Sequence, residues 1–352
     1  MRWDGRPMLA TNRRHPPSFG GHRPARLLRD SGGFALILTI LIVSILVVVT
    51  LQFNRAMWTG LYASANLRDG IRLGCMARSG VNCALAVLSE DAASSSSDSL
   101  LEPWALSKEL SLSSAQLFEQ GRFQVEITDL CGRIAINCLI NADGGYNETQ
   151  KAFLSRFLGL DRFGLESDAV DDLMDAIKDW IDPDDETTRF GAESGYYQSL
   201  EDPYACSNGP MGSLGQLRLV KGMTDALFFG GQDTQGGIGD YLSVWGDGKI
   251  NINTADPVVL LALSDDMDME MVQEMMDYRL DEENDLTDPD WYRNIPGMGH
   301  VIIDPDLIKT SSDYFEVCAE GMIEGEEIHR RVTAVVRRKE GASIQIVSWK
   351  AE

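Results

Sequence analysis

An uncharged apolar run, Phe34–Leu51, constrains this chain more than any other feature of its sequence. As a helix the run is about 27 Å long, close to the roughly 30 Å hydrocarbon core of a bilayer. Residues 1–33 carry seven arginines against two aspartates, and by the positive-inside tendency they stay in the cytoplasm. The sequence therefore predicts a single-pass inner-membrane protein with a cytoplasmic N-terminus.

The whole chain has a formal net charge of −23, and residues 1–33 contribute +5 from seven arginines and two aspartates, so about −28 belongs to the rest of the chain, whose bulk lies in the periplasm in a Gram-negative cell. Such acidity argues against nucleic-acid binding, because phosphates are neutralised by lysine and arginine. It is compatible with cation binding. Solubility alone explains most of these carboxylates.

Three interpretations of the apolar run compete. A secretory signal peptide has a shorter apolar region and a small-residue cleavage site, which residues 52–55 do not provide. A plain signal anchor is the second interpretation. The third is the type IV prepilin class, in which a peptidase cuts a basic leader after glycine; the junction Gly33–Phe34 resembles such a site. Glycine suits it, because the absent Cβ lets a protease approach the backbone.

Beyond residue 55 the pattern first predicts a continued amphipathic helix and then a short sheet. Apolar residues at helical spacing are Leu61, Leu67, Ile71, Ala77, Val81, Leu85 and Leu88. Ser89–Ser99 is predicted to be a flexible linker. Arg122–Thr128 alternates as a strand does, and we expect Arg133–Asn137 to be its hairpin partner.

The remaining patterns indicate a helical block followed by strands. Predicted helices are Glu148–Leu158, Asp168–Trp180, Leu217–Phe229, Pro257–Ser264 and Met269–Leu280, the last with Met269, Val272, Met275 and Met276 as core filling. Predicted strands are Tyr314–Ile323, Glu327–Lys339 and Ser343–Trp349, with hairpin turns at Glu324-Gly325 and Glu340-Gly341. One sheet interrupted by a helical domain explains this order best.

An acidic loop, Asp179–Gly222, is the most informative soluble segment. It has eight carboxylates between Asp179 and Asp202. Calcium takes six to eight hard oxygen ligands, and a carboxylate-rich loop with Gly and Pro can supply them. The spacing is not that of an EF-hand. A solvated acidic loop, with Asp182 capping a helix, is the alternative.

The same loop resembles that of the protein K minor pseudopilin family of type II secretion systems. The matching motifs are Asp179-Trp180-Ile181-Asp182, Gly191-Ala192-Glu193, Tyr196-Tyr197, Pro203-Tyr204, Asn208-Gly209-Pro210 and Leu217–Gly222, followed later by Gly248–Leu263. Most pilins have Glu at the fifth mature position, where this chain has Leu38, a departure that resembles protein K alone. The resemblance extends from Asp30 over most of the chain.

This resemblance implies an α+β fold: a pilin-like long N-terminal helix plus an antiparallel sheet, with a large all-α domain inserted between strands. The implied domains are a removed leader (1–33), the membrane half of the helix (34–54), the amphipathic half with linker and first strands (55–140), the inserted helical domain (141–311) with its acidic loop (179–222), and the C-terminal strands (312–352).

The resemblance also implies a function. A prepilin peptidase would cut after Gly33, and Phe34 would be N-methylated. With other minor pseudopilins as partners, the chain would sit at the tip of the periplasmic pseudopilus, help initiate its assembly and help export folded proteins across the outer membrane. Calcium is the implied cofactor, with candidate ligands Asp182, Asp184, Asp185, Glu193, Glu201 and Asp202.

No catalytic constellation is found, and we expect a protein that is not an enzyme. The four histidines, at 15, 22, 300 and 329, do not lie near a nucleophile motif, and GxSxG, HExxH and phosphate-loop patterns are missing. Two alternatives to a pseudopilin remain. One is a signal-anchored periplasmic binding module, and the other is a helix-hairpin-helix DNA-uptake protein.

The DNA-uptake alternative rests on Ile250–Ala255 and Pro296–Gly299, which resemble parts of helix-hairpin-helix modules. Four nearby acids, Asp265, Asp266, Asp268 and Glu270, would repel phosphate. A helical scaffold without DNA binding is therefore favoured, and nucleic acid is not an expected partner.

Six cysteines add little. Cys75 and Cys83 are too far apart along a helix for a disulfide. Cys131, Cys138, Cys206 and Cys318 can pair in three ways or remain free thiols.

Overall fold

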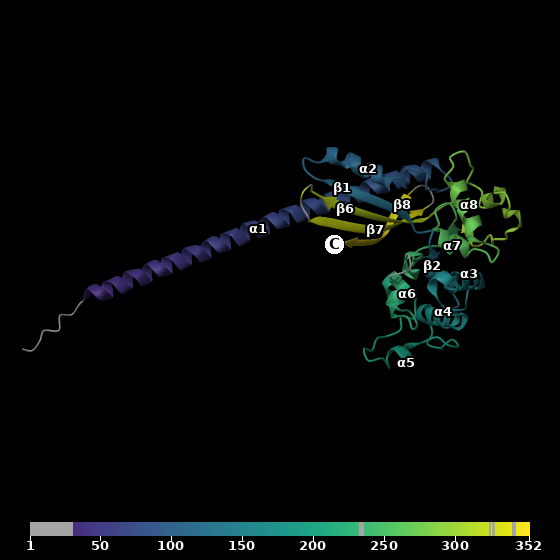
Figure 1. Cartoon of the computed structure of the whole chain (residues 1–352), viewed down its shortest axis with the longest axis horizontal. Helices are drawn as coiled ribbons and strands as arrows, with labels where there is room; N and C mark the ends of the chain where they lie inside the picture. The colour runs from purple at the N-terminus through teal and green to yellow at the C-terminus, as the bar shows by residue number, and fades with distance from the viewer. Residues whose placement is uncertain (1–30, 232–235, 324, 326–327, 340–342) are drawn as a thin grey trace, which may run out of the picture. The chain divides into compact units, whose positions relative to one another are not determined.

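The computed structural model describes residues 31–231, 236–323, 325, 328–339 and 343–352, with elements labelled as in Figure 1. The chain divides into two compact units, Met1–Ala65 and Asn66–Glu352, and each is described by itself. Helix α1 (Ser31–Ser94) contributes residues to both. Residues 1–30 of the predicted leader lie outside the described residues. Gly33 and Phe34 lie within α1.

Within the first unit, α1 is apolar and exposed. By length and composition it is the one helix of the described residues that is able to cross a membrane, and none of its most apolar window is buried. Its exposed side chains include Phe34, Leu38 and Phe53. Such a continuous apolar surface is covered by lipid or by protein in a stable assembly, because its exposure to water is unfavourable.

Within the second unit, the end of α1 packs one face on a sheet. The buried residues of this face are Leu73, Met76, Ala77, Val81, Ala84 and Leu88. The expectation that Leu67 and Ile71 share this face is wrong, since they are 67% and 61% exposed. The 3.6-residue period turns both away from the Ala77–Val81 stripe.

The sheet is antiparallel, as the sequence resemblance implied, and its four strands have the order β1-β6-β7-β8. The strands are β1 (Arg122–Asp129), β6 (Tyr314–Met322), β7 (His329–Lys339) and β8 (Ser343–Ala351). Alternate residues Phe123, Val125 and Val317 are buried against α1. At Gly321 a Cβ would lie 2.1 Å from the Leu73 carbonyl oxygen, so the close approach of helix and sheet requires glycine. The predicted turns at 324–325 and 340–341 include residues outside the described ranges.

Serine side chains close the outer edge of β1. They come from α2 (Ser107–Ser113) and the 3-10 helix η1 (Ser114–Leu117). Ser111 Oγ accepts from Val125 N at 2.9 Å and donates to Val125 O at 3.2 Å. Ser114 Oγ donates to Phe123 O at 2.7 Å. Because the free backbone groups of β1 are satisfied in this way, this edge is not open to another strand.

Residues 130–313 form a predominantly helical block between β1 and β6. Its α-helices are α3 (Glu148–Leu158), α4 (Ser167–Ile181), α5 (Ser194–Tyr197), α6 (Asp225–Phe229), α7 (Pro257–Leu261) and α8 (Met269–Arg279). Its 3-10 helices are η2 (Ile136–Leu139), η3 (Asp161–Phe163), η4 (Leu214–Leu219), η5 (Ile238–Asp240), η6 (Trp291–Asn294) and η7 (Met298–His300).

The block is not all-α as expected, because it also has two short parallel strand pairs. One joins β2 (Ile134–Ala135) to β3 (Leu242–Ser243), and the other joins β4 (Ile250–Asn251) to β5 (Ile308–Lys309). The hairpin predicted between Arg122–Thr128 and Arg133–Asn137 is therefore wrong. A turn closed by Arg133 N and Leu130 O leads the chain away from β1, whose partner is β6.

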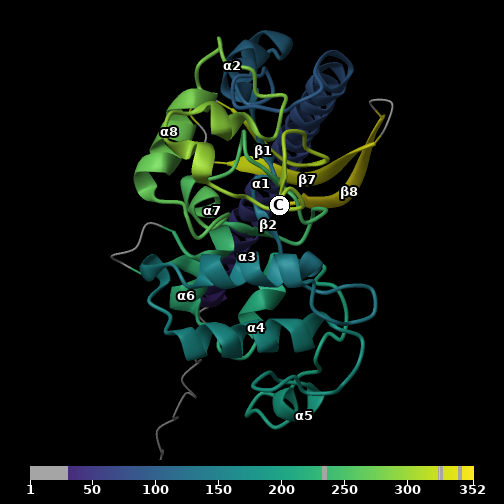
Figure 2. The ribbon, with the colours of Figure 1, turned by 90° about the vertical axis from the view of Figure 1, so that its right-hand side faces the viewer.

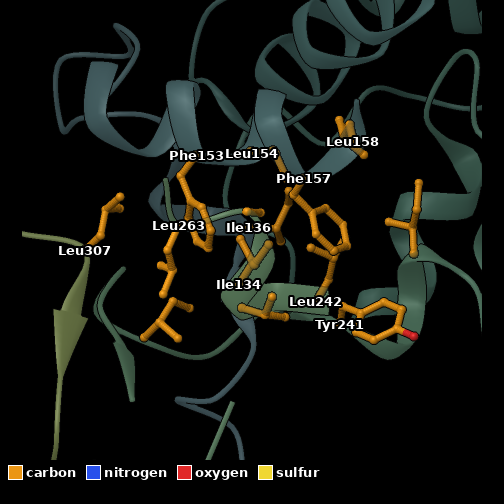
Figure 3. Close-up of a cluster of buried hydrophobic side chains, with 14 of the residues drawn as sticks. Ile134, Ile136, Phe153, Leu154, Phe157, Leu158, Tyr241, Leu242, Leu263 and Leu307 are labelled. Atoms are coloured by element: carbon orange, nitrogen blue, oxygen red, sulfur yellow. The ribbon is translucent and has the colours of Figure 1, made fainter. Parts of the chain in front are cut away.

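Apolar burial explains why Ile134 and Ile136 leave the sheet. Figure 3 shows both beside Phe153 and Phe157 of α3, within the hydrophobic cluster of the helical block. Burying one such aliphatic side chain stabilises by about 1.5–3 kcal/mol. Figure 2 shows α3 and α4 side by side, as their contacts require.

The predicted helices match the structure where their apolar period is strong. The bounds of α3 are those expected. Leu217–Phe229 instead divides into η4 and α6. In α8, Val272 and Met275 are buried, whereas Met269 is 59% exposed and is not core filling, because it occupies the first turn of the helix.

The predicted flexible linker Ser89–Ser99 is also corrected. Helix α1 continues to Ser94, and both Asp91 and Asp98 are buried. Arg338 of β7 pairs with Asp91 Oδ2 at 2.9 Å and with Asp98 Oδ1 at 2.7 Å. A partly buried guanidinium group that bridges two carboxylates thus orders a segment whose composition indicates a linker.

A buried polar network joins the sheet to the helical block. The Asp129 carboxylate, at the end of β1, accepts hydrogen bonds from Ser312 Oγ at 2.6 Å and Asn251 Nδ2 at 3.2 Å. Asn251 belongs to the 250–255 stretch that resembles a DNA-binding module, and here its amide is used inside the protein. Burial raises the pKa of Asp129, in opposition to these hydrogen bonds.

Asp91 provides a pH-dependent test of the Arg338 junction. Burial, with the charges of Glu102 and Asp98, raises the pKa of Asp91 to about 6 although Arg338 opposes the shift. An unfolded aspartate titrates near about 3.9. Asp91 therefore contributes most to stability below that pH, and this contribution is lost as the pH rises through 6.

We expect Asp91→Asn to reduce the fall of Tm between pH 4 and 6, measured by circular dichroism on the full chain in detergent. Glu90→Gln, on the exposed neighbour, is the control and should keep the wild-type slope. An unchanged slope in Asp91→Asn would show that Asp91 does not titrate in this window.

Candidate metal centre

Three carboxylates meet at the C-terminal end of α4. Asp179 lies in the last turn of α4, Asp182 is the residue that caps the helix, and Glu193 directly precedes α5. Asp179 and Asp182 are three residues apart, which places them on one side of the helix end. The loop between Asp182 and Glu193 brings the third carboxylate back to the other two. Figure 2 shows α4 next to the segment that carries α5.

The three side chains are buried and close together. One carboxylate oxygen from each of Asp179, Asp182 and Glu193 lies within 4.8 Å of the others. Their exposed fractions are 0%, 0% and 4%. Both Glu193 oxygens and Asp182 Oδ1 are without hydrogen-bond partners among the described residues. Burying unpaired carboxylates is costly, so this geometry suits a cation.

The pKa shifts of the three carboxyl groups also show that their ionised forms are unfavourable in this site. Burial raises the pKa of both aspartates. Burial and then the charges of Asp179 and Asp182 raise the pKa of Glu193 to about 8. These groups repel one another when ionised, and a bound divalent cation would relieve that repulsion. Three carboxylates offer hard oxygen ligands, which calcium prefers.

Two further polar groups lie at the edge of the site. Asp185, an exposed carboxylate, accepts a hydrogen bond from Ser194 N at 3.2 Å, next to Glu193. Asn208 Oδ1 is buried without a partner. Amide oxygens are also calcium ligands. Asp185 and Asn208 are therefore able to complete a set of oxygen donors.

Aromatic packing and one thiol hold the returning loop against α4. The Trp180 and Tyr197 rings are 5.1 Å apart, and the Tyr197 and Tyr204 rings are 5.3 Å apart. Cys206 Sγ donates to the Asp179 carbonyl oxygen at 3.5 Å. All six cysteines are free thiols. The tyrosine motifs of the acidic loop thus serve packing.

The six predicted ligands divide between the site and its surroundings. Asp182 and Glu193 lie in the cluster. Asp185 is exposed and accepts a hydrogen bond from Ser194 N, next to Glu193. Asp184, Glu201 and Asp202 are exposed and lie outside the cluster. The prediction omitted Asp179, although its i, i+3 spacing from Asp182 in the Asp-Trp-Ile-Asp motif was available as a signal.

A second acidic cluster has a different character. Asp91, Asp98 and Glu102 also approach one another within 4.8 Å. Arg338 binds two of these carboxylates, and the Glu102 carboxylate accepts from Trp104 Nε1 at 2.8 Å. Because these carboxylates already have a cation and a hydrogen-bond donor of the protein as partners, we do not assign a metal to the cluster.

Comparisons with known proteins place the site in a family context. A family model described as type II secretion system (T2SS), protein K, matches residues 132–229, which include all three carboxylates. Type II secretion system protein K of Pseudomonas aeruginosa is 24% identical over 320 residues, 89% of this chain and 91% of that protein. The Aeromonas hydrophila protein K is 27% identical over 57% of this chain and 61% of its own length.

A solved structure has a similar fold. It is a chain of the GspK-GspI-GspJ complex from the enterotoxigenic Escherichia coli type 2 secretion system, with a TM-score of 0.63 and 17% identity. The similarity covers 83% of this chain and 99% of that chain. It includes the long helix, the antiparallel sheet and helical content.

Gly191 offers a test of how tightly the loop is packed on the carboxylates. A Cβ at this position would lie 2.1 Å from Asp179 Oδ2 and 2.8 Å from the Asp175 carbonyl oxygen. We expect Gly191→Ala to lower the free energy of unfolding by about 1–3 kcal/mol, the usual cost of overpacking. Urea denaturation of the full chain measures this change.

Gly195→Ala is the matched control on the same loop, because a Cβ there meets no atom within 4 Å. Its free energy of unfolding should stay close to that of the wild type. Equal destabilisation by the two substitutions would contradict the close packing of Gly191 on Asp179.

Proposed function

We propose that this chain is a member of the type II secretion system protein K family and works as a minor pseudopilin of that system. The observation that carries the proposal is the combination of an exposed apolar N-terminal helix with an antiparallel sheet, interrupted by the block that the family model matches. The proposed role is structural rather than catalytic. It is to help initiate a periplasmic pseudopilus through which folded proteins are exported across the outer membrane.

The proposed assembly uses the two parts of the chain differently. The apolar part of α1 anchors the protein in the inner membrane, with residues 1–33 cytoplasmic and the bulk of the chain periplasmic. It then packs with equivalent helices of other minor pseudopilins. The similar solved structure, a chain of the GspK-GspI-GspJ complex, supports partners of this kind.

A position at the tip of the pseudopilus follows from two features. Leu38 leaves no carboxylate to pair with the terminal amine of a further subunit. The inserted residues 130–313 would crowd a repeating filament, whereas the end of a filament has free space.

We infer that calcium occupies the cluster of Asp179, Asp182 and Glu193. The support is the set of unpartnered, buried carboxylate oxygens. Calcium would neutralise their charge and fix the loop between α4 and α5. Asp185 and Asn208 are the candidates for further oxygen ligands.

Processing of the leader is tested by the intact mass of the membrane-expressed chain, with and without a co-expressed prepilin peptidase. We expect loss of residues 1–33 and one added methyl group at Phe34. A bulky residue prevents close approach of the peptidase to the backbone, so Gly33→Leu should remain uncut. A wild-type chain that stays uncut with the peptidase would favour the signal-anchored periplasmic binding module instead.

Calcium binding is tested by thermal unfolding of the full chain in detergent, in calcium and in chelator. Calcium at about 100 times its Kd should raise the free energy of unfolding by about 2.7 kcal/mol, and Tm accordingly. Glu193→Gln should remove most of this difference because it deletes a charged ligand.

Glu201→Gln is the control, since Glu201 is an exposed acid on the same loop. It should keep the wild-type response to calcium. A wild-type Tm that is the same in calcium and in chelator would refute the calcium site.

A further inference from the structure

A lysine of α4 is in direct contact with the carboxylate cluster. Lys178 Nζ forms an ion pair with Asp182 Oδ2, four residues further along the helix. The same nitrogen lies 4.0 Å from Asp179 Oδ1 and donates to Thr188 Oγ1 at 2.9 Å. The Lys178 side chain is only 12% exposed. Its ammonium group therefore directly contacts the carboxylate cluster.

A second lysine contacts the same loop in a different way. Lys221 Nζ donates to the carbonyl oxygens of Phe190 and Gly191, at 2.7 Å and 3.1 Å. It does not form an ion pair with any described carboxylate of the cluster. Lys221 thus binds the loop backbone, whereas Lys178 binds the carboxylate of Asp182, a candidate metal ligand.

The ammonium group of Lys178 and a divalent ion would compete for Asp182. A metal ion in contact with that carboxylate would lie within a few Å of Nζ, where two positive charges repel strongly in a buried site. While Nζ binds Asp182, one of three carboxylates is already neutralised. The net charge that attracts an ion is then reduced by one.

An aromatic ring also lies near the ammonium group of Lys178. The Tyr146 ring is 5.9 Å from Lys178 Nζ, a cation–π distance. The Tyr146 hydroxyl donates to Asp175 Oδ1 at 2.7 Å, so the ring is held in position. Lys151 Nζ already lies 4.2 Å from the centroid of the same ring, so after release of Asp182 the main remaining partner of Lys178 is the Thr188 hydroxyl.

We propose that Lys178 is a resident counter-ion that competes with calcium for Asp182 and thereby sets the affinity of the site. This inference rests on the calcium site proposed above. It makes occupancy of the site an exchange of one cation for another. The loop keeps partial neutralisation at low calcium, and high calcium displaces the lysine.

The test is calcium titration by calorimetry on the full chain in detergent, freed of divalent ions with chelator. We expect Lys178→Met to bind calcium about tenfold or more tightly than the wild type, because a positive charge is removed from the site. In chelator its Tm should fall below that of the wild type, since the three carboxylates then repel one another. Lys178→Arg should stay close to the wild type because it keeps the charge.

Lys221→Met is the matched control, because it removes a lysine that binds the loop backbone and does not pair with a carboxylate of the cluster. It should lower Tm equally in calcium and in chelator, with unchanged affinity. If Lys178→Met fails to fold, Lys178→Gln replaces it, since Gln keeps a donor without the charge.

Three outcomes distinguish the competition from the calcium site itself. Calcium binding by the wild type with equal or weaker binding by Lys178→Met and Lys178→Gln would overturn competition and leave the calcium site standing. No calcium binding by any of the proteins would overturn both. Calcium binding by the wild type together with tighter binding by Lys178→Met and unchanged binding by Lys221→Met would support the competition.

Discussion

The pairing of β1 with β6 is the constraint on which the rest of the second unit depends. Residues 130–313 separate the two strands, and closing so long a loop costs conformational entropy that the ladder alone would have to offset. The block reduces that cost by folding around its own hydrophobic cluster. The two clusters then meet at the Asp129–Asn251 network, where buried polar groups satisfy each other.

Two different cationic side chains, Arg338 and Lys178, form ion pairs with buried aspartates of this chain. At the junction, Arg338 binds Asp91 and Asp98 with its planar guanidinium group, a geometry suited to permanent pairing. At the end of α4, Lys178 offers a single flexible ammonium group to Asp182, beside carboxylate oxygens without a partner. The first arrangement is complete within the protein. The second leaves buried carboxylate oxygens without a hydrogen-bond partner among the described residues.

Sequence periodicity predicted the helices and strands whose formation depends mainly on residues close by in the sequence. The apolar helix, α3 and the C-terminal strands follow from periodicity, which nearby residues fix. Periodicity does not reveal that β1 pairs with a strand far along the chain, or that Arg338 orders residues predicted to be a linker. At the metal centre, resemblance to a family indicated Asp182 and Glu193. Asp179 and Lys178 lie three and four residues before Asp182 on the same helix end, whereas Glu193 reaches them only through the three-dimensional meeting of that helix end and a loop.

The two ends of the helical block emerge from neighbouring strands. Asp129 and Phe315 are paired across the sheet, at a separation that an ordinary hairpin turn of a few residues would bridge. Topologically, the whole block takes the place of one such turn. The sheet therefore sets no limit on the size of what is inserted there, and a large domain can be gained, exchanged or reduced during evolution without changing the strand order.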